Sequence, residues 1–176
     1  MRLFATLTPP ASIRAALLAT MHGIDGARWQ AEEQLHLTLR FCGEVAESDV
    51  PLLAAELRRV AFAPFPLCIA GVGHFEKKNR VHTVWAGVEA GEELFALQRR
   101  IEAACQRAGL EAEGRRFTPH ITLARGSLPG AAVAPFLSDH ALLSTPAWQV
   151  EGFALYESTL TPNGARYTPL AEFEGS

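Results

Sequence analysis

The sequence has few features that would stabilise or localise a protein other than through an ordinary hydrophobic core. Its three cysteines, Cys42, Cys68 and Cys105, include no CxxC pair, and their odd number excludes a simple disulfide framework. No uninterrupted apolar run approaches ~18 residues, so no transmembrane helix is expected. The apolar run before Pro9 and Pro10 is too short for a signal peptide. These absences predict a cytoplasmic protein with buried free thiols and no membrane contact.

An excess of positive charge is also missing. Sixteen lysines and arginines stand against nineteen acidic residues, giving a net charge of −3. This excludes a protein that coats nucleic acid through bulk charge, so any contact with nucleic acid must be local. With 48% hydrophobic and 20% charged residues, the composition is that of a folded globular chain. Residues 1–176 are expected to form a single domain, or one domain of two similar lobes, large enough to need no structural metal.

Glycine-rich phosphate loops are absent as well. Neither GxGxxG nor GxxxxGK[ST] occurs, so neither a Rossmann nor a P-loop fold is supported. Alternating apolar residues and turn signals predict strands over 2–8, 35–41, 65–75, 80–88, 119–125, 147–157 and 165–171. Helical spacing predicts helices over 11–22, 49–61, 92–108 and 130–138. Ser48 is the expected N-cap of the second helix, and Gly109 the expected end of the third. This order predicts an α+β fold with mainly antiparallel strands.

One short pattern occurs twice, as HLTL at residues 36–39 and HITL at residues 120–123. Because side chains alternate across a strand, His36 shares a face with Thr38, and His120 shares a face with Thr122. Aliphatic residues seal the opposite face of each strand. A polar pair on such a face is either exposed to solvent or part of a functional site, since burying a polar group without a hydrogen-bond partner is costly. Two half-exposed strands that meet water would give the same pattern, and spacing alone does not decide between the two interpretations.

Two histidines that face each other suit general acid–base catalysis, because neutral and protonated imidazoles coexist near pH 7. Threonine hydroxyls donate hydrogen bonds to the oxygens of a bound anion. The combination fits cleavage of a phosphoester by in-line displacement, with one histidine on the attacking oxygen and one on the leaving oxygen. A metal site has less support, because no carboxylate or thiolate accompanies the motifs. A serine hydrolase has no GxSxG elbow to support it, and no cofactor is expected.

With their flanking residues, the motifs resemble those of the 2H phosphoesterase superfamily, and within it the RNA 2′,3′-cyclic phosphodiesterases, historically called 2′-5′ RNA ligases. The resemblance covers nearly the whole chain and rests on MRLFATLTPP, LHLTLRFCGEV, RVHTVWAGV, RRFTPHITLAR, FALYES and ARYTPL. It implies a bilobal α+β fold, in which two lobes related by a pseudo-twofold axis place one motif each at a central cleft, with helices outside. The implied activity is metal-independent hydrolysis of RNA 2′,3′-cyclic phosphate ends to 2′-phosphates, with weak reversible 2′-5′ ligation.

The resemblance also implies roles for the four motif residues. His36 corresponds to the general acid that protonates the departing 3′ oxygen, and His120 to the base that activates water. Thr38 and Thr122 correspond to ligands of the phosphate oxygens. No metal ligand is implied at any of these positions.

In the family, the position five residues after each catalytic histidine helps to hold the terminal nucleobase. Those positions are Phe41 and Arg125, a ring and a guanidinium plane that can both stack on a base. Strict alternation would put both side chains on the back face, so each strand is expected to bend or end after its threonine. The adjacent His82 and Thr83 depart from the family pattern, and His82 is interpreted as a strand or rim histidine.

Two other functions remain open. One is a non-catalytic module that binds RNA ends, although binding alone does not require an acid–base pair. The other is a phosphodiesterase for small cyclic nucleotide-type phosphates, which substrate length would distinguish. The expected partner is accordingly RNA with a 2′,3′-cyclic phosphate end or a cyclic nucleotide, acted on by a monomer.

Basic residues near the motifs also allow two interpretations. They are either a solvated charged surface or a small positive rim that steers RNA ends to the cleft; they are Lys77, Lys78, Arg80, Arg115 and Arg116. Tyr156 is expected either to line the cleft or to pack in the core. The three tryptophans are expected in the core; they are Trp29, Trp85 and Trp148.

Overall fold

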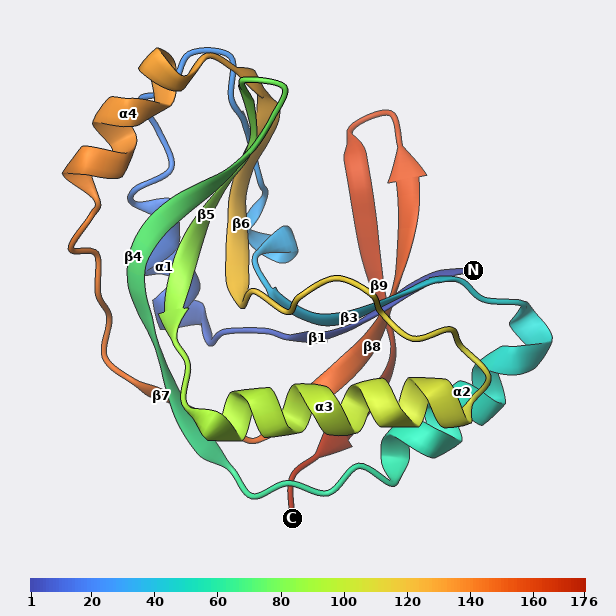
Figure 1. The fold of residues 1–176 in the computed structure, drawn as a ribbon. Coiled ribbons are helices and arrows are strands. Elements are labelled where there is room, and N and C mark those ends of the chain that lie inside the picture. The colour runs from blue at the N-terminus through green and yellow to red at the C-terminus, as the bar shows by residue number, and fades with distance from the viewer.

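A computed structural model describes residues 1–176 and has four α-helices around one nine-stranded sheet (Figure 1). The strands are β1 (Arg2–Leu7), β2 (Arg28–Trp29), β3 (Leu37–Glu44), β4 (Phe65–Lys77), β5 (Arg80–Glu89), β6 (His120–Leu128), β7 (Trp148–Val150), β8 (Gly152–Thr161) and β9 (Gly164–Glu174). The helices are α1 (Ala11–Leu18), α2 (Val50–Arg58), α3 (Glu92–Arg107) and α4 (Gly130–Asp139), with 3₁₀ turns η1 (Glu32–Gln34) and η2 (Glu47–Asp49). Every strand pairing is antiparallel, which confirms the predicted α+β class.

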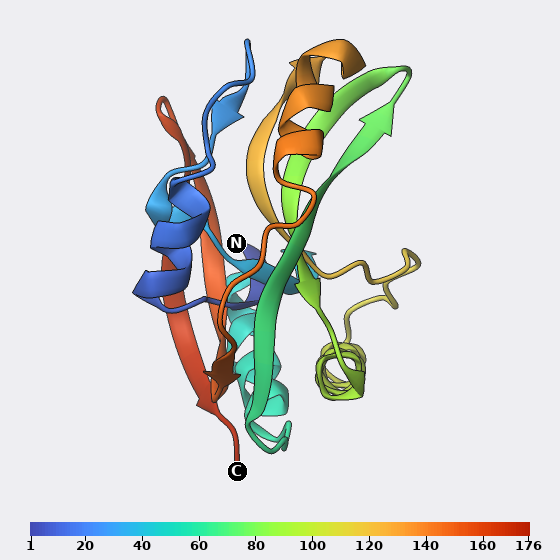
Figure 2. The same ribbon diagram turned by 90° about the vertical axis from the view of Figure 1, so that its left-hand side faces the viewer.

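The sheet is divided in two by a narrow junction. Its strand order is β7-β4-β5-β6-β3-β1-β8-β9, with β2 added to β6. The two central strands, β3 and β6, pair only through Leu37 and Ile121. On one side of this junction β6 continues into β5, β4 and β7, and on the other side β3 continues into β1, β8 and β9. Figure 2 shows the two halves diverging from this point, which agrees with the two-lobed arrangement that was expected.

The core forms where the apolar faces of the strands meet the helices. Leu3, Ala5 and Leu7 of β1 are all buried, which leaves the alternate residues of this strand on its other face. Helix α3 packs on β3, α2 on α3 and α4 on β5. Arg40 is a buried charge between β3 and α3, where it donates to the carboxylate of Glu102 and to two backbone carbonyl oxygens. Its guanidinium is therefore satisfied despite burial.

The helix predictions are wrong at three points, one of which is the end of α2 at Arg58 rather than at residue 61. Helix α1 ends at Leu18 rather than at residue 22, and the Thr20 hydroxyl donates to the Leu17 carbonyl oxygen at 2.7 Å just beyond it. Ser48 is not an N-cap, because it lies inside η2 and α2 begins after Asp49. By contrast, α3 ends as predicted, since Gly109 adopts a φ of 95° that other residues avoid.

Three differences from the predicted strands change the architecture, in addition to shifts of up to four residues at other strand ends. Strand β3 begins at Leu37, so His36 lies just before the strand rather than within it. The strand predicted over 147–157 is two strands, β7 and β8, separated by Glu151. The two-residue strand β2 was not predicted.

Outside the sheet, two findings bear on the environment of the protein. No helix combines the length and apolarity that crossing a bilayer requires. All three cysteines are free, but only Cys105 is buried, so the expectation of buried thiols is wrong for Cys42 and Cys68, which are partly exposed.

Candidate active site

The two repeated motifs meet at the junction of the sheet. Leu37 and Ile121 are direct partners in the antiparallel pairing of β3 and β6, and each directly follows a motif histidine. Both aliphatic side chains are buried, whereas His36 and His120 are partly exposed on the other face. The histidines are close enough that the charge of His120 lowers the pKa of His36. The arrangement therefore gathers two imidazoles from segments 84 residues apart.

A β-bulge follows the threonine of each motif. Opposite β1, Thr38 pairs with Thr6 but Arg40 pairs with Ala5, so Leu39 is an extra residue. The same shift occurs in β6, where Thr122 pairs with Trp85 and Ala124 with Val84, with Leu123 as the extra residue. In each strand the two residues after the threonine are both buried. The side-chain alternation is thereby reversed, as one residue is inserted without a partner.

The bulges place Phe41 and Arg125 on the side of the histidines. Phe41 has 44% of its surface exposed and its ring lies 6.0 Å from that of Phe4, which itself stacks on His36. Arg125 is exposed and forms no ion pair, yet its charge lowers the pKa of His36 and of His120. The bulges therefore provide the bend after each threonine that was expected if Phe41 and Arg125 are to lie on the same side as the motif histidines.

His36 is enclosed by aromatic rings of the first half of the sheet. The Phe4 ring stacks on it at 5.0 Å, and the Tyr167 ring meets it edge-on at 5.0 Å. Burial lowers the pKa of His36 to about 4, opposed by a hydrogen bond with the backbone of Gln34 and assisted by the positive charges of Arg125 and His120. His36 is therefore neutral near pH 7 until a bound anion compensates these effects.

His120 has an equivalent aromatic enclosure in the second half. The Phe75 ring meets it edge-on at 5.0 Å, and the Trp85 ring lies 5.9 Å away. The Trp85 ring in turn lies over Gly73, where any Cβ would overlap it. Burial is the main cause that lowers the pKa of His120.

The hydrogen bond of His120 determines which of its nitrogens carries the proton. Its Nδ1 lies 2.6 Å from the carbonyl oxygen of Thr118, which accepts and does not donate. Nδ1 must therefore be the donor, and in the neutral ring Nε2 keeps a free lone pair. Such a ring is prepared to accept a proton from a water molecule or an alcohol.

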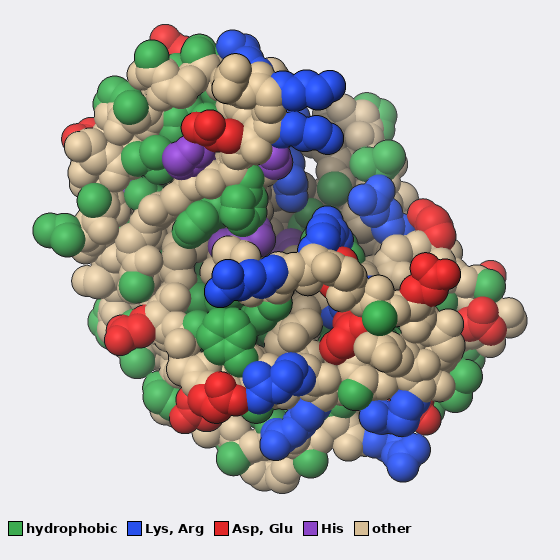
Figure 3. Space-filling view, viewed as in Figure 1, with side chains coloured by type: hydrophobic (Ala, Val, Ile, Leu, Met, Phe, Trp, Pro, Cys, Tyr) green, Lys and Arg blue, Asp and Glu red, His purple; other side chains and the backbone are tan.

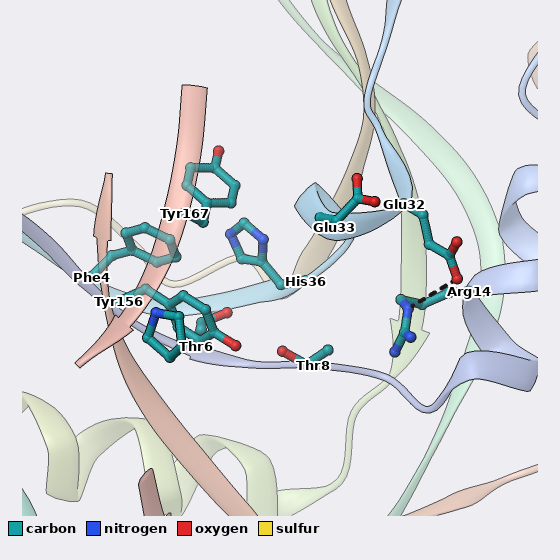
Figure 4. A pocket seen from close by; sticks show the side chains of 10 residues that line it. Phe4, Thr6, Thr8, Arg14, Glu32, Glu33, His36, Tyr156 and Tyr167 are labelled. Atoms are coloured by element: carbon teal, nitrogen blue, oxygen red, sulfur yellow. Dashed lines mark ion pairs between the residues drawn. The ribbon is translucent and has the colours of Figure 1, made fainter. Parts of the chain in front are cut away.

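The motif threonines and Tyr156 are available to a ligand. Thr38 and Thr122 are partly exposed, and neither hydroxyl is bonded to the protein. A cavity of about 450 Å³ lies beside His36, with Tyr156 and Tyr167 on one side and the Arg14–Glu32 ion pair on the other (Figure 4). Tyr156 also stacks on Phe4, the ring that stacks on His36.

The residues of the site that could hold a metal are few. No group of three or more histidine, cysteine, aspartate or glutamate side chains lies close enough together to bind an ion. What the site offers is two imidazoles, two hydroxyls and one guanidinium. These groups can exchange protons with a substrate and bind the oxygens of an anion.

Sequence reasoning missed the aromatic enclosures. Trp85 was expected in the core, but it is partly exposed and its ring flanks His120. Phe4 and Tyr167 on the other side received no role at all. The available signal was weak, because only the register between neighbouring strands brings these rings to the histidines. His82 is, as interpreted, an exposed strand residue, with Nδ1 3.0 Å from the Thr83 hydroxyl.

Comparison with known proteins gives consistent matches over the full chain. An RNA 2′,3′-cyclic phosphodiesterase of Archaeoglobus fulgidus is 32% identical over 177 aligned positions, covering 99% of this chain and 100% of that protein. One of Thermus thermophilus is 36% identical, covering 98% of this chain and 89% of that protein.

Solved structures agree with these sequence relatives. The protein TT0787 of Thermus thermophilus has a TM-score of 0.82 and 31% identity, covering 99% of this chain and 97% of that one. E. coli LigT, crystallised with 3′-AMP, also has a TM-score of 0.82, with 27% identity, covering 99% of this chain and 98% of that one. The sequence model of the 2′-5′ RNA ligase superfamily matches residues 9–161. The chain therefore belongs to the 2′-5′ RNA ligase superfamily.

Proposed function

We propose that the protein hydrolyses RNA 2′,3′-cyclic phosphate ends to 2′-phosphates by general acid–base catalysis with two histidines and without a metal. The observation that carries this proposal is the meeting of two His-x-Thr motifs at Leu37 and Ile121, with both imidazoles on one face. The relatives named RNA 2′,3′-cyclic phosphodiesterase support the substrate class. The function extends over residues 1–176 as one unit, because each lobe supplies one motif.

In this mechanism His120 is the base. Its Nε2 accepts a proton from water, and the resulting hydroxide attacks phosphorus opposite the 3′ oxygen. The bond from Nδ1 to the Thr118 carbonyl oxygen keeps the ring in the required tautomer and orientation. As the ring becomes positive, that same hydrogen bond stabilises the charge.

His36 is the acid, which donates a proton to the departing 3′ oxygen. A residue with a pKa of about 4 is a poor proton carrier at neutral pH until the anionic substrate binds. The negative phosphate raises the pKa of His36, so that its protonation is coupled to binding. Thr38 and Thr122 donate to the non-bridging oxygens, where negative charge is concentrated.

The remaining roles concern the substrate's nucleoside. Phe41 and the Arg125 guanidinium hold the terminal nucleobase between them. If the 5′-hydroxyl of a second RNA replaces water, the same chemistry forms a 2′-5′ linkage with loss of the 3′ oxygen, and we propose that this ligation is weak and reversible. We further infer a cytoplasmic protein, which the three free thiols support, and propose that it acts as a monomer.

The test is hydrolysis of 2′,3′-cyclic AMP, with the product identified by phosphorus NMR in the presence of EDTA. The expected product is the 2′-phosphate, formed at an unchanged rate when the chelator is added. Loss of turnover in EDTA that one divalent ion restores would contradict the metal-free mechanism. Binding without turnover would favour the RNA-end-binding module instead.

A further inference from the structure

Two of the three cysteines meet where β3 packs on α3. Cys42 follows Arg40 by two residues on β3, and Cys105 follows Glu102 by three residues on α3, which places each pair on one side of its element. Arg40 donates to the carboxylate of Glu102, so the same approach of strand and helix brings Cys42 to Cys105. Cys42 accordingly packs against the core cluster that contains Cys105.

The two thiol groups interact directly. A hydrogen bond between them, together with burial, raises the pKa of Cys42, and the same hydrogen bond lowers the pKa of Cys105. The nearby positive charge of Arg40 favours a thiolate at either sulfur. Once the pair has lost one proton, the remaining proton is held between the two sulfur atoms, with the Cys42 thiol donating to the Cys105 thiolate.

Cys68 has the opposite environment. Its Sγ lies 3.4 Å from a carboxylate oxygen of Glu89. Burial and this carboxylate both raise the pKa of Cys68, because each disfavours a thiolate. The chain therefore contains an unreactive thiol with which the pair can be compared.

Only one thiol of the pair can be reached from solvent. Cys105 is fully buried, whereas Cys42 is partly exposed. Cys42 also lines a cavity of about 430 Å³ that Ala108 and Leu110 border at the end of α3. A small oxidant that enters this cavity meets Cys42 first and has Cys105 directly behind it, which is the arrangement of an attacking thiol and a resolving thiol.

Cys42 is an unpaired residue of its strand. Opposite β1, Phe41 pairs with Phe4 and Gly43 pairs with Leu3, so Cys42 is the extra residue of a second bulge in β3. Formation of a disulfide requires the two sulfur atoms to approach to about 2.05 Å. An unpaired position can shift toward the helix with less loss of strand pairing than a paired one, and Phe41 is its immediate neighbour.

We propose that Cys42 and Cys105 form a peroxide-sensitive thiol pair, whose oxidation to a disulfide joins β3 to α3 and shifts Phe41 out of the nucleobase site. The pair is linked to Phe41 in a second way, because Arg40 donates to the Phe41 carbonyl oxygen. Formation of the disulfide is independent of catalysis, whereas its effect on substrate binding rests on the proposed function. In a reducing compartment the pair stays reduced until an oxidant is present.

The oxidation takes two steps, with hydrogen peroxide as the oxidant. In the first, the Cys42 sulfur attacks one peroxide oxygen, the O–O bond breaks, hydroxide leaves, and the thiol proton passes to the Cys105 thiolate. In the second, the Cys105 sulfur attacks the sulfenic acid at Cys42, the S–S bond forms and the S–O bond breaks. The departing hydroxide takes the Cys105 proton and becomes water, so two electrons have passed from the thiols to the peroxide.

The first experiment detects the disulfide. The reduced protein is treated with a small excess of hydrogen peroxide and denatured, and its thiols are counted with Ellman's reagent. Two of the three thiols are expected to be lost, with a mass lower by two hydrogen atoms, and dithiothreitol should restore both values. Trypsin should then release the peptides of residues 41–58 and 101–107 as one cross-linked species.

Cysteine variants identify the two roles. In Cys105→Ala the sulfenic acid has no resolving thiol, so dimedone should label Cys42. In Cys42→Ser, Cys105 should stay unmodified because it is buried, and this variant gives the test if Cys105→Ala does not fold. The matched control Cys68→Ser should form the same cross-link as the wild type.

The second experiment compares reduced and oxidised protein in the hydrolysis of 2′,3′-cyclic AMP. Oxidation is expected to raise KM by about 3-fold or more and to change kcat less, because the shift occurs at Phe41 and not at either motif histidine. Dithiothreitol should restore the KM. Cys42→Ser should show the same KM before and after peroxide treatment.

Three thiols remaining after peroxide treatment, or a cross-link that requires Cys68, would overturn the thiol pair. A disulfide that leaves KM unchanged would overturn its effect on the nucleobase site. Failure of the proposed function would look different, because the reduced wild type would then not hydrolyse 2′,3′-cyclic AMP while the cross-linked peptides still formed. In that case the affinity for the intact nucleotide, measured by calorimetry, takes the place of KM.

Discussion

His36 and His120 each lie between two aromatic rings, and the rings come from different lobes. Phe4 and Tyr167 enclose the first, Phe75 and Trp85 the second. Aromatic walls exclude water, which disfavours the charged imidazole and lowers both pKa values. The proton balance of the site is therefore determined by residues that carry no titratable proton themselves, apart from the phenol of Tyr167.

Removing the ring of Trp85 is expected to raise the pKa of His120. In Trp85→Ala, water replaces the indole beside His120, so its pKa should move up toward 6.5, while that of His36 stays at about 4. The measurement is an NMR titration of the imidazole resonances. Trp85→Phe keeps a ring at this position and should preserve the wild-type value. An unchanged His120 pKa in a folded Trp85→Ala protein would contradict the account.

At the scale of the strands, the β-bulges decide which side chains reach the site. Each motif strand alternates regularly up to its threonine and then gains one residue relative to its neighbour. Without this insertion, Phe41 and Arg125 would point into the core. The bulges also let Leu39 and Leu123 fill the core immediately next to a functional position.

Substitutions of Leu39 and Phe41 test whether the bulge in β3 separates a core residue from a residue of the site. Leu39 is 2% exposed, so Leu39→Ala is expected to lower the free energy of unfolding by about 2–5 kcal/mol with KM little changed. Phe41 is 44% exposed, so Phe41→Ala should cost about 1 kcal/mol or less and chiefly raise KM. Urea unfolding and steady-state kinetics on both variants give the comparison. Equal losses of stability would show that Phe41 belongs to the core.

The same scale shows what the sequence could and could not predict. The motif strands were located to within three residues because alternation is a local signal. The sequence predicted that each strand bends or ends after its threonine, but it did not predict a bulge at a given residue. A bulge is defined by the pairing with the neighbouring strand and not by the sequence of the bulged strand alone. Strand β2 was not predicted because two residues are too few to show alternation of apolar and polar side chains. Its assignment as a strand depends on its pairing with β6.

For the molecule as a whole, the proton affinity of the site is linked to stability. The pKa of His36 is about 4 in the folded protein and 6.5 in the unfolded chain. Between these values the unfolded chain binds a proton at His36 and the folded protein does not. Stability is therefore complete above pH 6.5 and is lost as the pH falls toward 4, by about 3 kcal/mol in total.

A neutral replacement should abolish this part of the acid sensitivity. The free energy of unfolding of the wild type is expected to fall by about 2–3 kcal/mol more than that of His36→Gln between pH 7 and pH 4.5. Urea titrations of both proteins at the two pH values measure the difference. Parallel pH dependences would mean that His36 is as basic in the native state as in the unfolded chain.

Whole-molecule charge also shows a limit of composition. A net charge of −3 predicts no general coating of positive charge, but it could not indicate that basic side chains lie in and around the hollow between the two halves of the sheet, as Figure 3 shows. That distribution follows from topology, since the pairing of β2 with β6 and the position of β1 bring distant arginines to one face.

The most direct test of the account is the turnover of 2′,3′-cyclic AMP by His36→Ala, His120→Ala and the double variant. Each single substitution is expected to lower kcat by about 10²–10⁴-fold, and the double variant should be little worse than either. His82→Ala, which removes an exposed histidine outside both motifs, should retain wild-type turnover. Circular dichroism must show that all four proteins are folded. Near-normal turnover by either folded motif variant would contradict the two-histidine mechanism.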